Sequence, residues 1–265
     1  MNRPAAIATS LHPALAAVRV GCVQYLNSKP LIYGADFPVQ FDHPSGLARD
    51  LVAGSLDVAL VPVFEALLHP PWRAVDDIAI ACDGAVYSVF LAHRGPLRAV
   101  RRIALDAASR TSVHLLKVLL AEVHGLTPEY GASDHAADAE LLIGNQAIDF
   151  RLAHAEGWHF LDLGEEWKRH TGLPFVFALW LMRPTLPNAA AIADELRTLK
   201  ADGLAHLPEI VRADAAHPPE VGMLYLTQHI RFGCGEREKA SLDRFRTLLE
   251  RHALIPPGGE PLRFV

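Results

Sequence analysis

The alternation of short β-rich runs with helical stretches constrains the fold more than any other feature of the sequence. Residues 18–61 predict a strand, a helix and a second strand, with Gly54 ending the helix. Residues 103–143 repeat this order, and there Gly125 ends the helix. Repeated strand–helix–strand units build sheets covered by helices, so the sequence predicts a fold of the α/β class.

Two apolar, β-rich runs bracket the second of these units, at residues 85–92 and 174–181. We expect them to cross between two lobes that enclose a ligand cleft. The predicted organisation is a lobe I of residues 18–92 and 178–265, an inserted lobe II of residues 93–177, and a flexible N-terminal extension of residues 1–17.

Composition excludes several classes of partner. The chain has 25 Lys and Arg against 30 Asp and Glu, a net charge of −5, which gives no positive field for a nucleic acid. The longest apolar run, residues 173–182, is half the roughly 20 residues that a membrane-spanning helix needs. Three widely separated cysteines, Cys22, Cys82 and Cys234, favour a reducing compartment over a disulfide framework. We therefore expect a cytoplasmic protein with a small-molecule ligand, no nucleic-acid partner and no membrane partner.

The segment Ser109-Arg110-Thr111-Ser112 is the clearest candidate for ligand binding. It precedes a predicted helix, whose first N–H groups and partial positive charge attract an anion, and its hydroxyls and guanidinium suit a carboxylate. The alternative is that Ser109 merely caps the helix. The sequence lacks the HExxH, GxSxG, GxGxxG and P-loop motifs, so it predicts neither a metal site nor a nucleotide cofactor.

Two further candidates lie beside predicted strands. Ser88 interrupts an apolar run, where a buried hydroxyl needs a partner in the backbone or in a ligand. Tyr25, Asn27 and Ser28 follow the first strand, at the edge where open α/β sheets bind ligands, although an Asn in a turn is often there for its conformation.

Six segments of the sequence form a recognisable set. They are YLNSKPLIYG (25–34), ACDGAVYSVFLA (81–92), SRTSV (109–113), LLIGNQAI (141–148), DLGEEWKRHTGLPFVFALW (162–180) and RFGCGEREKASLDRF (231–245). In this order they resemble the chorismate dehydratases of the futalosine route to menaquinone. The resemblance covers nearly all of residues 18–249. It implies an α/β, two-lobed fold like that of type II periplasmic binding proteins, in an intracellular enzyme.

The implied reaction removes water from chorismate, a small dicarboxylate, and gives 3-[(1-carboxyvinyl)oxy]benzoate without a metal or redox cofactor. On this resemblance Ser88 and residues Ser109 to Ser112 donate hydrogen bonds to the two carboxylates, and Tyr25 and Ser28 are substrate contacts. Asn27 matches the asparagine of the family's YLN motif and is the predicted catalytic residue. A neutral amide is a poor base, so we expect Asn27 to orient the group that removes the ring proton, for which the substrate's enolpyruvyl carboxylate is a candidate.

One position departs from the family pattern and leaves the substrate open. The chain has Asn145 where the family commonly has Asp in an IGD motif, and Asn145 is also a predicted substrate contact. If that Asp only organises a turn, Asn serves equally well; if its charge tunes the site, the substrate is a related one, as in a sister branch that acts on cyclic dehypoxanthine futalosine.

A non-catalytic binding or sensor module with the same two-lobed fold is the competing hypothesis. The start of the sequence shows neither a secretion signal nor a lipid-anchoring cysteine, and two lobes leave little of the 265 residues for an output domain, so the enzyme is favoured. The sequence allows either a monomer or a homodimer.

Overall fold

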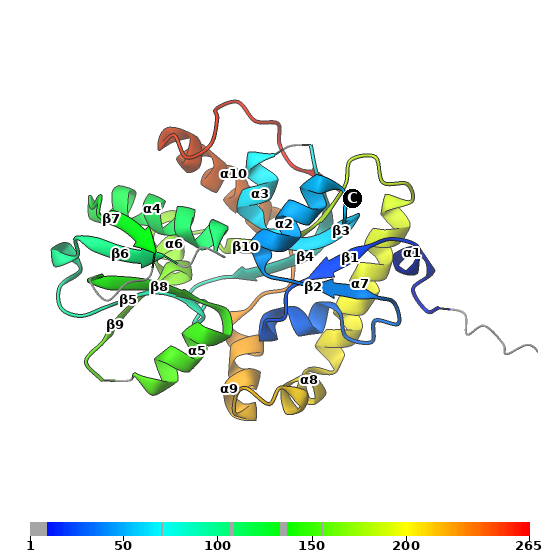
Figure 1. Cartoon of the computed structure of the whole chain (residues 1–265), viewed down its shortest axis with the longest axis horizontal. Coiled ribbons are helices and arrows are strands. Elements are labelled where there is room, and N and C mark those ends of the chain that lie inside the picture. Colours follow the sequence, from blue (N-terminus) through cyan, green and yellow to red (C-terminus); the bar gives the residue numbers. More distant parts are fainter. Residues whose placement is uncertain (1–9, 70, 106–108, 133–136, 155) are drawn as a thin grey trace, which may run out of the picture.

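Two mixed β-sheets organise the chain in a computed structural model that describes residues 10–69, 71–105, 109–132, 137–154 and 156–265 (Figure 1). The six-stranded sheet has the order β11-β4-β10-β3-β1-β2, from β1 (Val20–Cys22), β2 (Val39–Phe41), β3 (Val58–Pro62), β4 (Arg73–Cys82), β10 (Phe175–Met182) and β11 (Arg263–Phe264). The five-stranded sheet has the order β7-β6-β8-β5-β9, from β5 (Val89–His93), β6 (Arg102–Leu105), β7 (Glu129–Ala132), β8 (Ala139–Ile143) and β9 (His159–Asp162). The two sheets form the two halves of the molecule.

Helices cover both sheets. They are α1 (Pro13–Ala16), α2 (Pro44–Ala53), α3 (Val63–Leu68), α4 (Arg110–His124), α5 (Gly144–Ala153), α6 (Leu163–Thr171), α7 (Ala189–Ala205), α8 (Leu207–Ala213), α9 (Pro219–Leu224) and α10 (Glu236–Arg251). Two 3₁₀ segments, η1 (Leu26–Leu31) and η2 (Leu97–Ala99), and a π-helical turn, η3 (Tyr225–His229), complete the elements. In the part of the chain described, no helix combines the length and the apolar character needed to cross a bilayer.

Both predicted strand–helix–strand units are confirmed. Strand β1 pairs in parallel with β3 across α2, and β6 pairs in parallel with β8 across α4. Gly54 and Gly125 end the two helices in the left-handed conformation, with φ of 77° and 63°, which glycine adopts without a steric penalty. All five residues of β3 are buried, as expected of a central strand covered on both faces.

The crossovers differ from the predicted boundaries at residues 92 and 177. Strand β5 pairs with β8 and β9, so residues 89–92 belong to the five-stranded sheet. Strand β10 pairs with β3 and β4 along its length, so residues 175–177 belong to the six-stranded sheet. The chain passes between the sheets earlier on both occasions, at residues 83–88 and 163–174. An apolar run resembles a strand whichever sheet receives it, which is why its pattern could not fix the boundary.

The predicted flexible extension is wrong for residues 13–16, which form α1. Leu15 is fully buried, and the N–H groups of Ala14 and Leu15 donate to the carboxylate of Glu195 on α7, at 2.9 and 2.8 Å. A buried leucine and two charge-assisted hydrogen bonds hold this segment in place. Residues 1–9 of the predicted extension lie outside the described residues.

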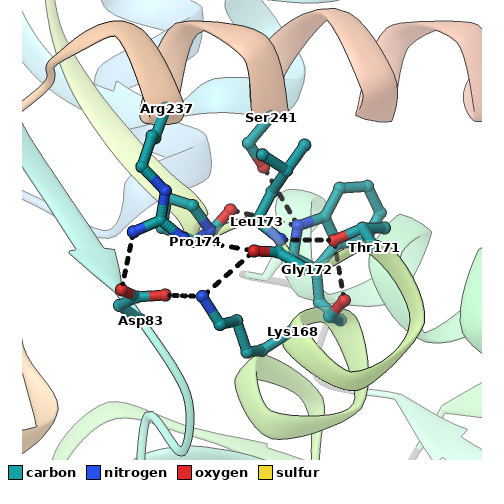
Figure 2. A network of polar contacts seen from close by, with 9 residues as sticks. Asp83, Lys168, Thr171, Gly172, Leu173, Pro174, Arg237 and Ser241 are labelled. Atoms are coloured by element: carbon teal, nitrogen blue, oxygen red, sulfur yellow. Dashed lines mark hydrogen bonds and ion pairs between the residues drawn. The ribbon is translucent and has the colours of Figure 1, made fainter.

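A polar cluster ties the two crossovers together (Figure 2). Asp83, directly after β4, accepts from Lys168 Nζ on α6 and from Arg237 Nη1 on α10, the latter at 3.0 Å. The same two cations donate to the carbonyl oxygen of Gly172, in the turn before β10, at 3.0 and 3.1 Å. We call Asp83, Lys168, Gly172 and Arg237 the crossover cluster, because it joins both segments that connect the sheets.

Candidate active site

A cavity lies where the two sheets meet, and elements of both sheets line it. From the six-stranded side come Val23, Tyr25, Asn27, Pro44, Leu60, Val61, Pro62, Ile80, Phe177 and Ala178, and from the crossover and the five-stranded side come Val86, Ser88, Val89, Ser109, Arg110, Thr111, Ser112, Ile143 and Gly144. Most of this wall is apolar, with a few polar groups among it, as is usual for a small-molecule site.

Most of the predicted site residues meet in this cavity. They come from three separate segments of sequence: Tyr25 and Asn27, then Ser88, then Ser109, Arg110, Thr111 and Ser112. Ser28 and Asn145 are not among the lining residues.

Asn27 and Ser88 are joined through a residue that the sequence did not single out. Tyr225, in η3, lies with its hydroxyl 2.9 Å from Asn27 Nδ2 and 2.7 Å from Ser88 Oγ. All three side chains are buried, and burial raises the pKa of Tyr225 well above its usual value, so the phenol stays protonated. Within the described residues, Asn27 Oδ1 is buried and has no hydrogen-bond partner. No local motif marks Tyr225, because it meets Asn27 across 198 positions of sequence.

The start of α4 supplies further donors to the cavity. Ser109 occupies the N-cap position, but its side chain makes no capping hydrogen bond, so the alternative of a merely capping serine is wrong. Thr111 Oγ1 accepts from Phe64 N at 3.1 Å, which fixes the start of α4 against the start of α3. The uncapped first turn of this 15-residue helix leaves N–H groups and a partial positive charge at the cavity.

Arg110 is held by a buried carboxylate. Its Nε lies 2.7 Å from Oε1 of Glu65, whose side chain is 7 % exposed while that of Arg110 is 41 % exposed. Burial raises the pKa of Glu65, and the nearby Arg110 and His69 oppose that shift. This is an ion pair without hydrogen-bond geometry, since Glu65 Oε1 has no hydrogen-bond partner among the described residues. It keeps the guanidinium at the cavity, where its charge attracts an anionic ligand.

His114 packs against Phe64 and the backbone of Arg110 and is neutral at neutral pH. Its ring stacks on Phe64 with centroids 3.6 Å apart, and its Nδ1 donates to the carbonyl oxygen of Arg110 at 2.7 Å. Burial is the main cause that lowers its pKa to about 4. The formal positive charge at this end of the cavity therefore comes from Arg110.

The remaining two predicted residues support the loop that carries Asn27. Ser28 is fully buried. Its hydroxyl hydrogen is shared between two backbone carbonyl oxygens, that of Val23 at 2.6 Å and that of Tyr25 at 2.8 Å from Oγ. Asn145 Oδ1, at the start of α5, accepts from Leu26 N at 3.2 Å, and so links the five-stranded half to η1. Because the contact uses an oxygen, which Asp also has, the geometry favours the organising role for this position over the charge role.

Two comparisons of the sequence with known proteins agree on a family. The model of a family described as menaquinone biosynthesis matches residues 18–251. A chorismate dehydratase from Thermus thermophilus is 33% identical over 262 residues, covering 87% of this chain and 94% of the relative.

Solved structures show the fold. A protein from Archaeoglobus fulgidus superposes with a TM-score of 0.74 at 18% identity, over 90% of this chain and 98% of that one. A Candida albicans gene product described as having the generic periplasmic binding protein fold gives a TM-score of 0.64 at 11% identity, over 91% and 92% of the two chains. The predicted two-lobed, periplasmic-binding-protein-like α/β fold is thus confirmed. With its family model matched over most of its length, this chain belongs to the menaquinone biosynthesis family.

Proposed function

We propose that this protein is a chorismate dehydratase, a hydro-lyase that removes water from chorismate to give 3-[(1-carboxyvinyl)oxy]benzoate. Family membership and the relative from Thermus thermophilus support this proposal. The observation that carries it is the meeting of Asn27, Ser88 and the start of α4 in one largely apolar cavity. Such a cavity suits an unsaturated ring that carries two carboxylates and one hydroxyl.

The hydrogen-bond donors of the cavity suit the negative charge that develops on the substrate during the reaction. Loss of the ring proton beside the ether oxygen, followed by departure of the neighbouring hydroxyl as water, leaves an aromatic ring and needs no oxidant. Negative charge then moves toward the ring carboxylate in the transition state. The N–H groups of α4, Arg110 and Ser88 are fixed donors of the kind that stabilise such charge, and this is the larger catalytic contribution we assign to the protein.

The proton acceptor in this proposal is the substrate itself. Of the described residues that line the cavity, none is His, Asp, Glu or Lys, and the amide of Asn27 is far too weak a base. The enolpyruvyl carboxylate of chorismate is a base that the substrate brings within reach of its own ring. The protein holds that carboxylate and the ring in one geometry.

A cytoplasmic location and a small dicarboxylate ligand are parts of the same proposal. All three cysteines, Cys22, Cys82 and Cys234, are free and buried, which fits a reducing compartment.

The first test is incubation of the purified protein with chorismate, without added metal or cofactor, followed by chromatography and mass measurement of the product. We expect catalytic turnover in the wild type, a loss of about a hundredfold in kcat/KM for Arg110→Gln, and little change for Arg49→Gln, an exposed arginine that is not among the cavity-lining residues. A thermal shift with chorismate but no product would contradict the lyase and favour the binding module. Turnover of cyclic dehypoxanthine futalosine in place of chorismate would favour the sister branch.

A further inference from the structure

Tyr225 is buried between two cavity residues that are far apart in sequence. The residue is 2 % exposed, and its hydroxyl lies within hydrogen-bond distance of Asn27 in η1 and of Ser88 in the crossover before β5. It belongs to the π-helical turn η3, in which Ile230 N donates to Tyr225 O at 3.1 Å, five residues apart. Single π-helical turns within helical segments are frequent at functional sites, because the wider ring redirects a side chain.

The donors and acceptors of this trio fix the direction of each hydrogen bond. Asn27 Nδ2 donates to Tyr225 Oη, so the phenolic oxygen is an acceptor on that side. If Ser88 also donated to Tyr225, the buried phenolic hydrogen would have no acceptor among the described residues, at a substantial desolvation cost. Tyr225 therefore donates to Ser88 Oγ.

This direction determines what the cavity offers to a ligand. The amide of Asn27 is held with Oδ1, the buried oxygen without a partner, available as an acceptor. Ser88 Oγ already accepts from Tyr225, so its own hydrogen is available as a donor. The hydroxyl of Tyr225, which does not line the cavity, therefore determines that Asn27 offers an acceptor and Ser88 a donor.

We propose that Tyr225 is a positioning residue that makes Asn27 the acceptor for the substrate's hydroxyl and Ser88 a donor to one of its carboxylates. The inference rests on the proposed function. It changes the expected role of Asn27, because an amide oxygen repels a carboxylate and binds a hydroxyl hydrogen. Asn27 holds the hydrogen of the departing hydroxyl, so the lone pairs of its oxygen stay accessible. The enolpyruvyl carboxylate removes the ring proton and passes it to this oxygen. The bond between the ring carbon and this oxygen then breaks, and water leaves.

The first experiment measures kcat and KM for chorismate and the inhibition constant of the product, 3-[(1-carboxyvinyl)oxy]benzoate, in wild type and Tyr225→Phe. The product lacks the ring hydroxyl, so its binding does not use Asn27 Oδ1. In Tyr225→Phe the Ser88 hydroxyl has no phenolic oxygen to donate to, so its hydrogen still reaches the product's carboxylate. We expect kcat to fall by about tenfold to a hundredfold and the inhibition constant to change by less than about twofold. Tyr33→Phe is the matched control, because the Tyr33 hydroxyl donates to Glu209 on the surface, and it should leave both constants unchanged.

Two results of this experiment overturn the inference. One is a Tyr225→Phe enzyme with unchanged kcat; the other is an equal loss of turnover and of product affinity together with a lower melting temperature, which marks a merely structural residue. If the wild type does not convert chorismate, the proposed function fails, and this inference fails with it. The wild-type measurement alone tests the proposed function, and the comparison with Tyr225→Phe tests the inference.

A second variant asks the same question without altering Tyr225. In Asn27→Asp the ionised carboxylate cannot donate to Tyr225, so the phenol donates to it and Ser88 must turn its hydrogen toward the phenolic oxygen. When the introduced carboxyl is protonated, its O–H replaces Nδ2–H and the original direction returns. We expect kcat/KM of Asn27→Asp to rise toward acid pH by about tenfold relative to wild type. A pH profile parallel to that of wild type would show that Tyr225 and Asn27 do not act through this hydrogen bond.

Discussion

The imidazole of His114 is kept neutral mainly by burial, with a further contribution from the positive charges of Lys117 and Arg110, and this couples stability to pH. Its pKa is about 4 in the folded protein against 6.5 for the free side chain. The unfolded chain therefore takes up a proton first as the pH falls, so the stabilisation is fully present above pH 6.5 and is lost toward pH 4.

We predict that His114→Gln reduces this pH dependence. Between pH 7 and 4.5 the wild type should lose about 2 kcal/mol of unfolding free energy through His114, a loss that the variant cannot show. Urea denaturation of both proteins at the two pH values measures this loss. His154→Gln is the control, since His154, directly after α5, makes the same kind of contact, from Nδ1 to the backbone carbonyl of Phe150. Parallel losses in wild type and His114→Gln would exclude this linkage.

The hydrogen bond from Leu26 N to Asn145 Oδ1 predicts which substitutions at position 145 the protein tolerates. Its carbonyl oxygen is the atom that contacts Leu26 N, so Asn145→Asp should keep kcat/KM within about threefold of wild type. Asn145→Leu removes the acceptor and should destabilise the protein by about 1 kcal/mol, because Leu26 N then lacks a partner. Steady-state kinetics and thermal melting distinguish the two, and a large loss of activity in Asn145→Asp would restore the charge role.

Among the elements, α3 and α4 are joined by a hydrogen bond to Thr111, beside the Arg110–Glu65 ion pair and the stacking of His114 on Phe64. Thr111→Val keeps the shape of the side chain but removes the acceptor of Phe64 N, a buried group in the first turn of α3. We predict a loss of about 1 to 2 kcal/mol of unfolding free energy together with lower kcat/KM, since the start of α4 is no longer fixed. Thr247→Val, on the exposed face of α10, is the matched control for denaturation, and equal stability of the two variants would contradict the assignment.

The same elements show how far local sequence can predict this molecule. Gly54 and Gly125 end their helices by a conformation that is a property of the residue itself, so the strand–helix–strand units were predictable. Ser109 to Ser112 were found because the start of a helix is also a local signal. Tyr225 was missed because its partners are distant in sequence and a π-helical turn has no simple spacing. Local sequence predicts no fixed structure for the segment of α1 because its anchor, Glu195, lies 180 positions away.

At the scale of the whole molecule, the crossover cluster joins the segments between the sheets. The pKa of Asp83 is lowered mainly by its hydrogen bond to Lys168, with a further contribution from Arg237. For a carboxylate with a lowered pKa, the stabilisation is present above the ordinary value of 3.8 and disappears as the pH falls below it. The cluster is therefore intact at neutral pH.

We predict that Asp83→Asn lowers the unfolding free energy at pH 7 by about 1 kcal/mol, a modest figure because the side chain is 29 % exposed and the ion pairs are screened. Glu236→Gln, whose carboxylate is 93 % exposed, should have no measurable effect. Thermal melting in low and high salt provides the measurement: the difference between Asp83→Asn and wild type should shrink in high salt, and a salt-independent difference would exclude the ion pairs as its cause.

The position of β10 between β3 and β4 has a consequence for the order of synthesis. Strands β5 to β9 come from one continuous stretch, so the five-stranded sheet has all its strands once residue 162 has left the ribosome. The six-stranded sheet has to wait for β10, which ends at Met182, because β3 and β4 are not neighbours without it. We expect pulse-labelled hydrogen exchange on ribosome-bound nascent chains to show protection of the amides of β5 and β8 before those of β3 and β4. The half of the molecule whose translation begins first is then the half that folds last. Until β10 is synthesised, the edges of β3 and β4 that will face it stay unpaired and accessible to a chaperone.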